Sequence, residues 1–465
     1  MMDLDKIIES MKEDIVRDTQ ELIRIRSVED KPLPGKPFGE GVNQALEKAL
    51  EISERLGFKV KNCEGYAGFA EYGEGQDLVG VLVHLDVVPE GDGWTYPPYA
   101  AEIHDNKIYG RGAIDNKGPA VACLYALKAI KDLNLPVSKR VRIIFGTNEE
   151  SGWGCMDYYM SHEEVPSCGF APDAEFPIIY SEKGILIFKL VKKFEKVLEG
   201  DLKLLSVKGG NRANMVPDYC EAVLKLNNNL LDIGKLLDEF KSRNSFKMEL
   251  VHDGDNIIIK SYGVSAHGSL PEKGKNAISQ LIMFLKELPL PADDIKVYID
   301  FLAEKIGMEY DGRSFGLAME DEISGKLVFN LGVMNLNSEQ GVVEINIRYP
   351  IKYTEKDVRE KVEEEVKGYG ITIEDWTDKA PLYVPADHFL VKILKKVYEE
   401  STGQEAKLIS IGGGTYARAM KNAVAFGPLF PGQEELAHQK DEYIDIDHLI
   451  LITKIYAKAI YELIK

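Results

Sequence analysis

The chain has 465 residues, enough for two or three domains, and 45% of them are hydrophobic, which is ample material for a buried core. Its formal net charge is −19, from 57 Lys and Arg against 76 Asp and Glu. This acidic excess disfavours nucleic acid and anionic membrane surfaces as partners, because both carry negative charge themselves. We therefore expect binding to neither nucleic acid nor membrane.

The cysteines and the first residues indicate the compartment. Five isolated cysteines occur without a C-x-x-C pair, at Cys63, Cys123, Cys155, Cys168 and Cys220. An odd, scattered set is typical of reduced intracellular thiols rather than of disulfides or a thiolate metal site. The start is an acidic amphipathic pattern without the plan of a signal peptide, and no apolar run approaches the roughly 18 residues of a membrane span. We expect a soluble cytoplasmic protein.

Helix and strand patterns alternate over the first 177 residues. Helical spacing predicts helices over 3–26, 42–56 and 119–131, and apolar runs predict strands over 58–64, 67–72, 78–86, 141–146 and 169–173. Polar residues collect directly after several of these strands. That arrangement is typical of an open α/β sheet, whose site lies beyond the carboxyl ends of its strands.

The pattern changes near residue 178. Strand-like segments then dominate, with clear helix patterns over 276–288 and 354–367. The segment E-A-V-L-K-L-N at 221–227 resembles V-V-E-I-N-I-R at 342–348, and a helical stretch follows each of them. This faint repeat indicates that the middle region has two similar halves.

The α/β pattern returns near residue 381. Helix patterns cover 388–400 and 446–464, and a strand pattern covers 423–427. The predicted fold class is α/β, with a phosphorylase/hydrolase-like catalytic domain that has a mixed sheet and helices on both faces. This domain would comprise residues 1–177 and 381–465 and be interrupted by an inserted α+β lid domain, residues 178–380.

The buried strand at 79–86, V-G-V-L-V-H-L-D, ends in His84 and Asp86. Strand side chains alternate between faces, so these two project the same way. A neutral imidazole can bind a metal there, while the carboxylate holds its other nitrogen. By itself H-x-D is a weak signal, and a structural histidine at a strand end is the commoner alternative.

Further acidic residues and one more histidine follow other predicted strands or lie in loops: Asp115, Glu149, Glu150, Asp173 and His438. Carboxylates gathered without cations would repel one another and become protonated. Two divalent ions would remove this conflict, and a mixed nitrogen and oxygen ligand set suits zinc, cobalt or manganese. One of the two adjacent glutamates can bind metal while the other serves as general base, and the spacing alone leaves open which is which.

Other motifs fail. His162 begins a zincin-like H-E-x-x sequence, but Pro166 stands in place of the second histidine. No G-x-S-x-G occurs, and G-G-G-T at 412–415 is not a phosphate loop because no G-K-[ST] follows. The alternative for 412–415 is a turn into a helix over 415–420.

Taken together, the motifs resemble the aminoacylase/carnosinase/carboxypeptidase family of di-metal peptidases, and within it the bacterial dipeptidase V type most closely. They are V-H-L-D at 83–86, G-R-G-A-I-D-N-K-G-P at 110–119, G-T-N-E-E-S-G-W at 146–153, P-D-A-E-F-P at 172–177, A-H-G-S-L-P-E-K-G-K-N-A at 266–277 and G-G-G-T-Y-A-R at 412–418. The matches keep their order along nearly the whole chain.

The resemblance implies a role for each residue that matches the family pattern. One metal would be held by His84, Asp115 and Asp173, and the second by Asp115, Glu150 and His438, with Asp115 bridging. Glu149 would be the general base, and Asp86 would orient His84. The Asp115–Asn116 bond matches a position that is often cis in the family.

The resemblance also implies roles in the inserted domain. His267 would stabilise the oxyanion, supplied within one chain by an enlarged lid, which favours a monomer. The residues that would hold substrate are Arg348, Asn214, Gly414 and Thr415. A guanidinium suits a C-terminal carboxylate because the pairing is bidentate. The alternatives are a surface strand charge for Arg348 and a turn histidine for His267.

The predicted activity is metal-dependent hydrolysis of dipeptides with a free amino terminus, through a metal-bridging water and Glu149 as base. Two divalent ions are the expected cofactors, with zinc as first choice and manganese or cobalt as alternatives. One alternative activity is a deacylase or desuccinylase acting on N-acyl amino acids at the same site. Another is a non-catalytic binding protein on the same fold, which the complete set of ligands and base disfavours.

Overall fold

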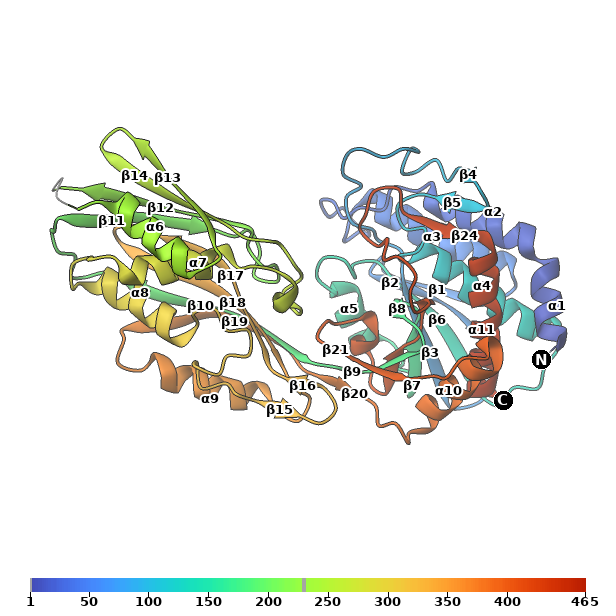
Figure 1. Ribbon diagram of the computed structural model, residues 1–465. Helices are drawn as coiled ribbons and strands as arrows, with labels where there is room; N and C mark the ends of the chain where they lie inside the picture. The colour runs from blue at the N-terminus through green and yellow to red at the C-terminus, as the bar shows by residue number, and fades with distance from the viewer. Residues whose placement is uncertain (1, 228–230) are drawn as a thin grey trace. The chain divides into compact units, whose positions relative to one another are not determined.

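The computed structural model of the protein describes residues 2–227 and 231–465 (Figure 1). The chain divides into two compact units, called unit 1 and unit 2 below. Unit 1 comprises Met1–Tyr180, Tyr383–Ile409 and Thr415–Lys465, and unit 2 comprises Ser181–Leu382 and Ser410–Gly414. The sequence pattern predicts that residues 410–414 belong to the interrupted domain. They group with unit 2 because Ile411 O accepts the N–H of Lys183 (3.0 Å) and Gly412 O accepts Arg348 Nη1 (3.2 Å).

Unit 1 is built on a mixed nine-stranded sheet with the order β1-β2-β6-β3-β7-β22-β9-β20, and β21 pairs with β9. The strands are β1 (Lys59–Cys63), β2 (Ala67–Tyr72), β3 (Leu78–His84), β6 (Arg140–Gly146), β7 (Cys168–Ala171), β9 (Ile178–Glu182), β20 (Leu382–Tyr383), β21 (Leu408–Ile411) and β22 (Ala423–Ala425). Central strand β3 pairs in parallel with β6 and β7, and all seven of its residues are buried. A continuous apolar run is typical of a parallel strand covered on both faces.

Helices cover both faces of this sheet, as the sequence predicts. They are α1 (Met2–Ser10), α2 (Lys12–Ile23), α3 (Glu40–Arg55), α4 (Lys117–Asp132), α5 (Gly154–His162), α10 (Phe389–Thr402) and α11 (Ile446–Ile464). Neighbouring residues of β2 point to opposite faces. A Cβ on Gly68 would lie 2.9 Å from Leu46 of α3, whereas the ring of Phe69 meets Tyr159 of α5 edge-on at 6.3 Å.

Several elements of unit 1 differ from the sequence prediction. The single helix expected over 3–26 is two helices, α1 and α2, separated at Met11. Ser10 Oγ donates to Ile7 O (2.7 Å), and such a side-chain bond competes with the helix ladder. Short β4 (Ile103–His104), β5 (Lys107–Tyr109) and β24 (Tyr443–Asp445) form an unforeseen three-stranded sheet, and β8 (Ala174–Glu175) pairs with β23 (Pro428–Leu429).

Unit 2 is built on an eight-stranded sheet with the order β13-β14-β12-β11-β17-β18-β10-β19. Its strands are β10 (Gly184–Lys193), β11 (Leu202–Gly209), β12 (Tyr219–Leu226), β13 (Lys247–Asp253), β14 (Asn256–Tyr262), β17 (Val328–Leu336), β18 (Gln340–Tyr349) and β19 (Ile371–Lys379). Its helices are α6 (Ile233–Arg243), α7 (Ala277–Glu287), α8 (Asp294–Lys305) and α9 (Glu355–Val366), and β15 (Glu320–Asp321) pairs with β16 (Gly325–Lys326) outside the main sheet.

Four strands lie on each side of the short β11–β17 junction in unit 2, where pairing runs from Val207↔Leu336 to Gly209↔Met334. The two segments of the faint sequence repeat, β12 and β18, are the second strands outward from this junction. Each is followed along the chain by a helix, α6 or α9 respectively. The similar sequences therefore occupy corresponding positions in the sheet.

Within the described part of the chain, no helix combines the length and the apolar composition needed to cross a membrane.

Candidate metal and catalytic site

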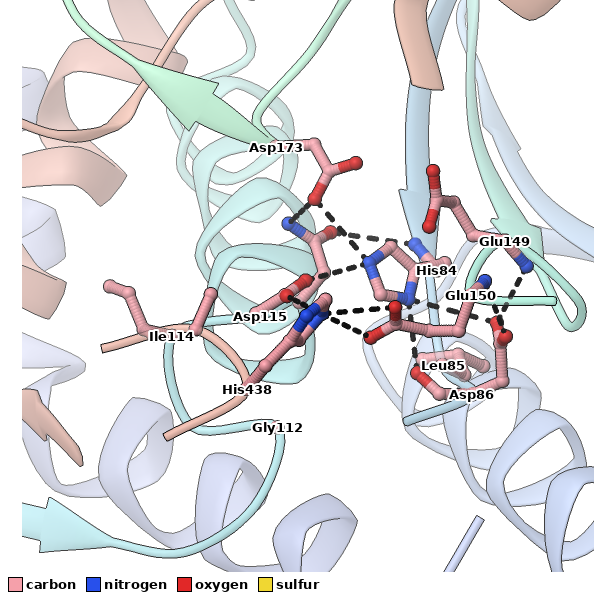
Figure 2. Close-up of polar contacts among 12 residues, drawn as sticks. His84, Leu85, Asp86, Gly112, Ile114, Asp115, Glu149, Glu150, Asp173 and His438 are labelled. Carbon is pink, nitrogen blue, oxygen red and sulfur yellow. Dashed lines mark hydrogen bonds and ion pairs between the residues drawn. The ribbon is translucent and has the colours of Figure 1, made fainter. Parts of the chain in front are cut away.

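Seven of the residues singled out in the sequence lie together in unit 1 (Figure 2). His84 is the last residue of β3, the two glutamates follow β6, and Asp173 follows β7. Because these strands run parallel, their carboxyl ends meet at one edge of the sheet. Asp115 comes from the loop before α4 and His438 from the loop between β23 and β24, so both loops add their side chains to that edge.

Asp115 lies between the two histidines. Its Oδ1 is 2.9 Å from His84 Nε2, and its Oδ2 is 3.2 Å from His438 Nε2. Asp173 Oδ1 lies 3.3 Å from the same nitrogen of His84, and Glu150 Oε2 lies 3.0 Å from that of His438. Two ligands of one tetrahedral zinc are roughly 3.3 Å apart, because each lies about 2.0–2.1 Å from the ion. The donor atoms are therefore spaced as two metal sites that share one carboxylate.

The tautomer of His84 fits this use. Its Nδ1 lies 3.0 Å from the backbone carbonyl of Asp86. A carbonyl only accepts, so Nδ1 carries the hydrogen, and in the neutral ring Nε2 would have its lone pair free for a metal. Ligand atoms within 4.8 Å of one another form two overlapping groups, His84, Asp115 and Glu150, and His84, Glu149 and Asp173.

Glu149 is the carboxylate on which the geometry and the resemblance differ. It belongs to one of the two compact groups, whereas the resemblance makes it a base rather than a ligand. Figure 2 shows its side chain turned away from the Glu150 side chain, which faces His438. No group in the described part of the chain donates a hydrogen bond to the Glu149 carboxylate. Burial and the charge of Asp173 raise the pKa of Glu149 well above its usual value, as a proton acceptor near neutral pH requires.

The other pKa shifts arise from desolvation of the clustered carboxylates and from their contacts with the two histidines. Burial raises the pKa of Glu150, with a further contribution from the charge of Asp115, and burial also raises the pKa of Asp173. Hydrogen bonds to Asp115 and Glu150 raise the pKa of His438 to about 10. Burial lowers the pKa of His84, but the charge of Asp173 and the bond to Asp115 outweigh it, so that pKa lies well above its usual value.

These shifts all indicate a demand for positive charge at the same place. Protons on the two histidines satisfy it in part, and divalent cations held by the same atoms would satisfy it more fully. The residues present therefore fit a pair of divalent metal ions.

Asp86 contacts His84 in a different way from the one expected. Its carboxylate Oδ1 is 3.6 Å from His84 Nδ1, too far for a hydrogen bond, and the backbone carbonyl of Asp86 orients the ring instead. The carboxylate accepts the backbone N–H groups of Glu149 (3.1 Å) and Glu150 (3.0 Å). Asp86 thus fixes the turn that carries both glutamates.

Sequence reasoning missed two residues at this site. Asn116 Nδ2 donates to Pro172 O (2.6 Å) and to Asp173 Oδ1 (3.2 Å), which fixes that carboxylate. The ring of Tyr416 stands edge-on to His84 at 6.1 Å. Both residues lie inside the motifs quoted above. The sequence alone does not show that Asn116 contacts Asp173 or that Tyr416 contacts His84. The peptide bond between Asp115 and Asn116 is cis, as the resemblance led us to expect.

The remaining candidates, apart from Thr415, belong to unit 2. The backbone N–H of Ser269 donates to His267 Nδ1 (3.3 Å), and Ser269 Oγ lies 2.6 Å from the same nitrogen. Asn214 O accepts the N–H of Gly268 (2.7 Å), so Asn214 lies beside the histidine turn. Arg348 is buried, and its Nε donates to Asn346 Oδ1 (2.9 Å) while Nη1 contacts Gly412, two residues before Gly414.

Thr415 begins a short 3-10 helix, Tyr416–Ala419, and its Oγ1 accepts the N–H of Ala417 (3.3 Å). The alternative of a turn into a helix therefore describes this segment, although the helix is shorter than the expected 415–420. A substrate contact by Thr415 stays a prediction.

Comparison with known proteins identifies close relatives. The profile of peptidase family M20/M25/M40 matches residues 80–462. The chain is 48% identical over 458 residues to "Putative dipeptidase YtjP" of Bacillus subtilis, covering 98% of both chains. It is 37% identical over 454 residues to "Putative dipeptidase SH1171" of Staphylococcus haemolyticus, covering 97% of both.

Solved structures share the fold. Human carnosine dipeptidase 1 superposes with a TM-score of 0.56 at 17% identity, covering 99% of each chain. The aminoacylhistidine dipeptidase of Vibrio alginolyticus gives a TM-score of 0.59 at 14% identity, covering 97% of this chain and 96% of the other. At these identities the likeness shows the fold alone.

Replacing Asp115 tests the shared carboxylate. We expect the chelator-treated protein to take up two equivalents of zinc or cobalt, and Asp115→Asn to lose at least one, because the amide offers a single neutral oxygen to two ions. Metal content after dialysis and calorimetric titration would measure this. Asp447→Asn, which removes a surface partner of Lys12 (2.8 Å), is the matched control. Two equivalents bound with unchanged affinity in Asp115→Asn would contradict the assignment.

Proposed function

The chain belongs to peptidase family M20/M25/M40, and we propose that it is a metal-dependent dipeptidase that hydrolyses dipeptides with a free amino terminus. The observation that carries the proposal is Asp115 between His84 and His438, with the unbonded, half-buried carboxylate of Glu149 beside them. The substrate class is supported by relatives named dipeptidases that match this chain nearly from end to end.

We propose that the metal ions are held by the residues in the implied sets: His84, Asp115 and Asp173 for one, and Asp115, Glu150 and His438 for the other. When bound, such ions lower the pKa of a water molecule and polarise a peptide carbonyl. Zinc is the first choice for this mixed nitrogen and oxygen set, with manganese or cobalt as alternatives.

Glu149 would take the proton from the attacking water and pass it to the leaving amine. Its raised pKa favours both steps, because a base works best when its pKa lies near the working pH. Asp86 would act through the backbone, by holding the turn on which Glu149 stands. Asn116 would keep the Asp173 carboxylate oriented.

His267 is suited to donate a hydrogen bond to the developing oxyanion. The backbone N–H of Ser269 can only donate, so His267 Nδ1 is the acceptor and the hydrogen of the neutral ring is on Nε2. Partial desolvation and the charge of Arg348 lower the pKa of His267 and keep the ring neutral at pH 7, although it is accessible to solvent. A preorganised donor of this kind is effective where negative charge develops.

We propose that Arg348 holds the C-terminal carboxylate of the substrate, with Asn214, Gly414 and Thr415 as further contacts. The bonds from Arg348 to Asn346 and Gly412 would hold its guanidinium plane in place. Residues 1–177 and 381–465 would form the catalytic domain, and residues 178–380 the lid that excludes water.

We also propose a cytoplasmic monomer. The five cysteines are buried and unpaired, which suits a reducing compartment. A chain that carries its own His267 in an enlarged insertion needs no partner subunit to supply one.

A substrate panel tests the proposed activity. Dipeptides with a free amino terminus and their N-acetylated forms would be assayed with chelator and then with added zinc, manganese or cobalt. We expect cleavage of the free-amine dipeptides alone, lost with chelator and restored by metal. Cleavage of only the acylated compounds would make the protein a deacylase, and no turnover with any metal would favour a binding protein.

Replacing the base separates its role from metal binding. We expect Glu149→Gln to lower kcat by about 10²–10⁴-fold while both metals stay bound, because the amide keeps the shape but takes no proton. Metal analysis and steady-state kinetics would be measured together. Glu164→Gln, a surface partner of Arg140 (2.6 Å), is the control. Loss of a metal from Glu149→Gln would instead make Glu149 a ligand.

Variants at His267 and Ser269 test whether His267 donates a hydrogen bond from Nε2 to the oxyanion. We expect His267→Ala to lower kcat by about 10²–10³-fold, as loss of an oxyanion donor does. Ser269→Ala should lower kcat by about tenfold with KM nearly unchanged, because the backbone donor remains and only the hydroxyl support is lost. Exposed Ser265→Ala in the same loop is the control. Unchanged kcat in His267→Ala would remove this residue from the mechanism.

A further inference from the structure

Glu442 is a buried carboxylate for which the proposed mechanism has no use. Its side chain is fully shielded from solvent, and it immediately precedes β24. It lies four residues after His438 and is remote in sequence from the other proposed ligands. A fully buried charge is costly unless partners surround it, so its contacts should explain its presence.

Four N–H groups surround this carboxylate. Oε2 accepts Arg111 Nη1 (2.8 Å) and the backbone N–H of Gly112 (3.0 Å). Oε1 accepts the backbone N–H groups of Ile114 (2.9 Å) and Asp115 (3.2 Å). Guanidinium and backbone N–H groups only donate, so both oxygens must act as acceptors, which is what an ionised carboxylate offers.

The backbone extends the same contact. Glu442 O accepts the N–H of Gly110 (2.9 Å), so residues 110–115 wrap around Glu442. Gly112 has φ +87°, a left-handed conformation that turns the loop toward the carboxylate, and a Cβ there would lie 2.9 Å from Val87. Figure 2 shows Gly112, Ile114 and Asp115 along this loop, with the Asp115 side chain directed at the two histidines.

Glu442 therefore joins two segments that each carry a proposed metal ligand. On one side it fixes the backbone nitrogen of Asp115, whose oxygens face His84 and His438. On the other side it belongs to the same loop as His438. We propose that Glu442, braced by Arg111, is a positioning residue of the metal centre that sets Asp115 relative to His438. This inference rests on the proposed di-metal function.

A contribution to stability alone does not account for the buried ion pair between Glu442 and Arg111. Replacing a buried ion pair by apolar groups is often neutral or stabilising, because desolvation of the charges is costly. Here the carboxylate also satisfies three backbone N–H groups of a single loop, which would otherwise be buried without partners. Its geometry is therefore specific to the conformation of the Asp115 loop.

The substitution Glu442→Gln keeps the shape of the side chain but removes its charge and one of its two acceptor atoms. The amide has nearly the same volume, but one of its two terminal atoms is a donor that would face two N–H groups. Either the Arg111–Gly112 pair or the Ile114–Asp115 pair then loses its acceptor. Glu442→Asp keeps the charge but is one methylene shorter, so it cannot reach both pairs from the same backbone position.

Cobalt binding provides the readout. The chelator-treated full-length protein would be titrated with Co²⁺ while the visible spectrum is recorded, with affinity from chelator competition and folding from circular dichroism. We expect both variants to fold, to bind Co²⁺ about 10–100-fold more weakly than wild type, and to show an altered spectrum. The matched control is Glu71→Gln, which breaks a largely buried bond to Arg142 (2.7 Å) at the other end of β6 and should leave Co²⁺ affinity unchanged.

Three outcomes would overturn the inference in distinguishable ways. Wild-type affinity and spectrum in both Glu442 variants would make the residue irrelevant to the metal centre. Loss of the fold in both would make it a folding residue only. Absence of Co²⁺ binding by the wild-type protein would instead refute the proposed di-metal function, and the positioning role with it.

Discussion

The confinement of several carboxylates to one buried sheet edge is the constraint on which the site depends. Parallel pairing of β3 with β6 and β7 forces the residues after these strands together, whatever their charge. Burial raises the pKa values of Glu149, Glu150 and Asp173, and the two histidines respond with pKa values above their usual range. Divalent cations held there would relieve this conflict at the place where the fold creates it.

Backbone N–H groups bind two of the acidic side chains around this cluster, in addition to the Arg111 side chain at Glu442. The Asp86 carboxylate is held by two N–H groups of the loop after β6, and that of Glu442 by three N–H groups of the loop before α4. A carboxylate that accepts several N–H groups of one loop stabilises a particular conformation of that loop. Each loop then presents its proposed ligand or base in one orientation.

The sequence predicts the residues of the cluster because strand ends are easy to recognise. The apolar run before His84 marks β3, and the acids after β6 and β7 follow strands of the same kind. Elements without such a pattern were missed. Strands β4, β5 and β24 are two or three residues long, too short for alternation to show, and α5 carries no clear amphipathic repeat.

Contacts between residues that lie far apart in the chain also could not be predicted from the sequence. Helix α8 was missed because I-K-V-Y-I at 295–299 reads equally well as an alternating strand. The carboxylate of Asp86 was expected on His84, two residues away, but it bonds to a loop more than sixty residues along the chain. Sequence spacing describes what neighbouring residues can reach, and it says nothing about which remote loop lies against them.

His267 and Asp115 illustrate the two ways in which this chain orients a functional group. The tautomer of His267 depends on the N–H of Ser269, two residues away, so the turn A-H-G-S can encode it locally. The position of Asp115 depends on Glu442, 327 residues away, so only the completed fold can set it. A histidine of the first kind can be oriented as soon as its own turn forms. A proposed metal ligand of the second kind is in place only when its loop lies against Glu442, the residue before β24.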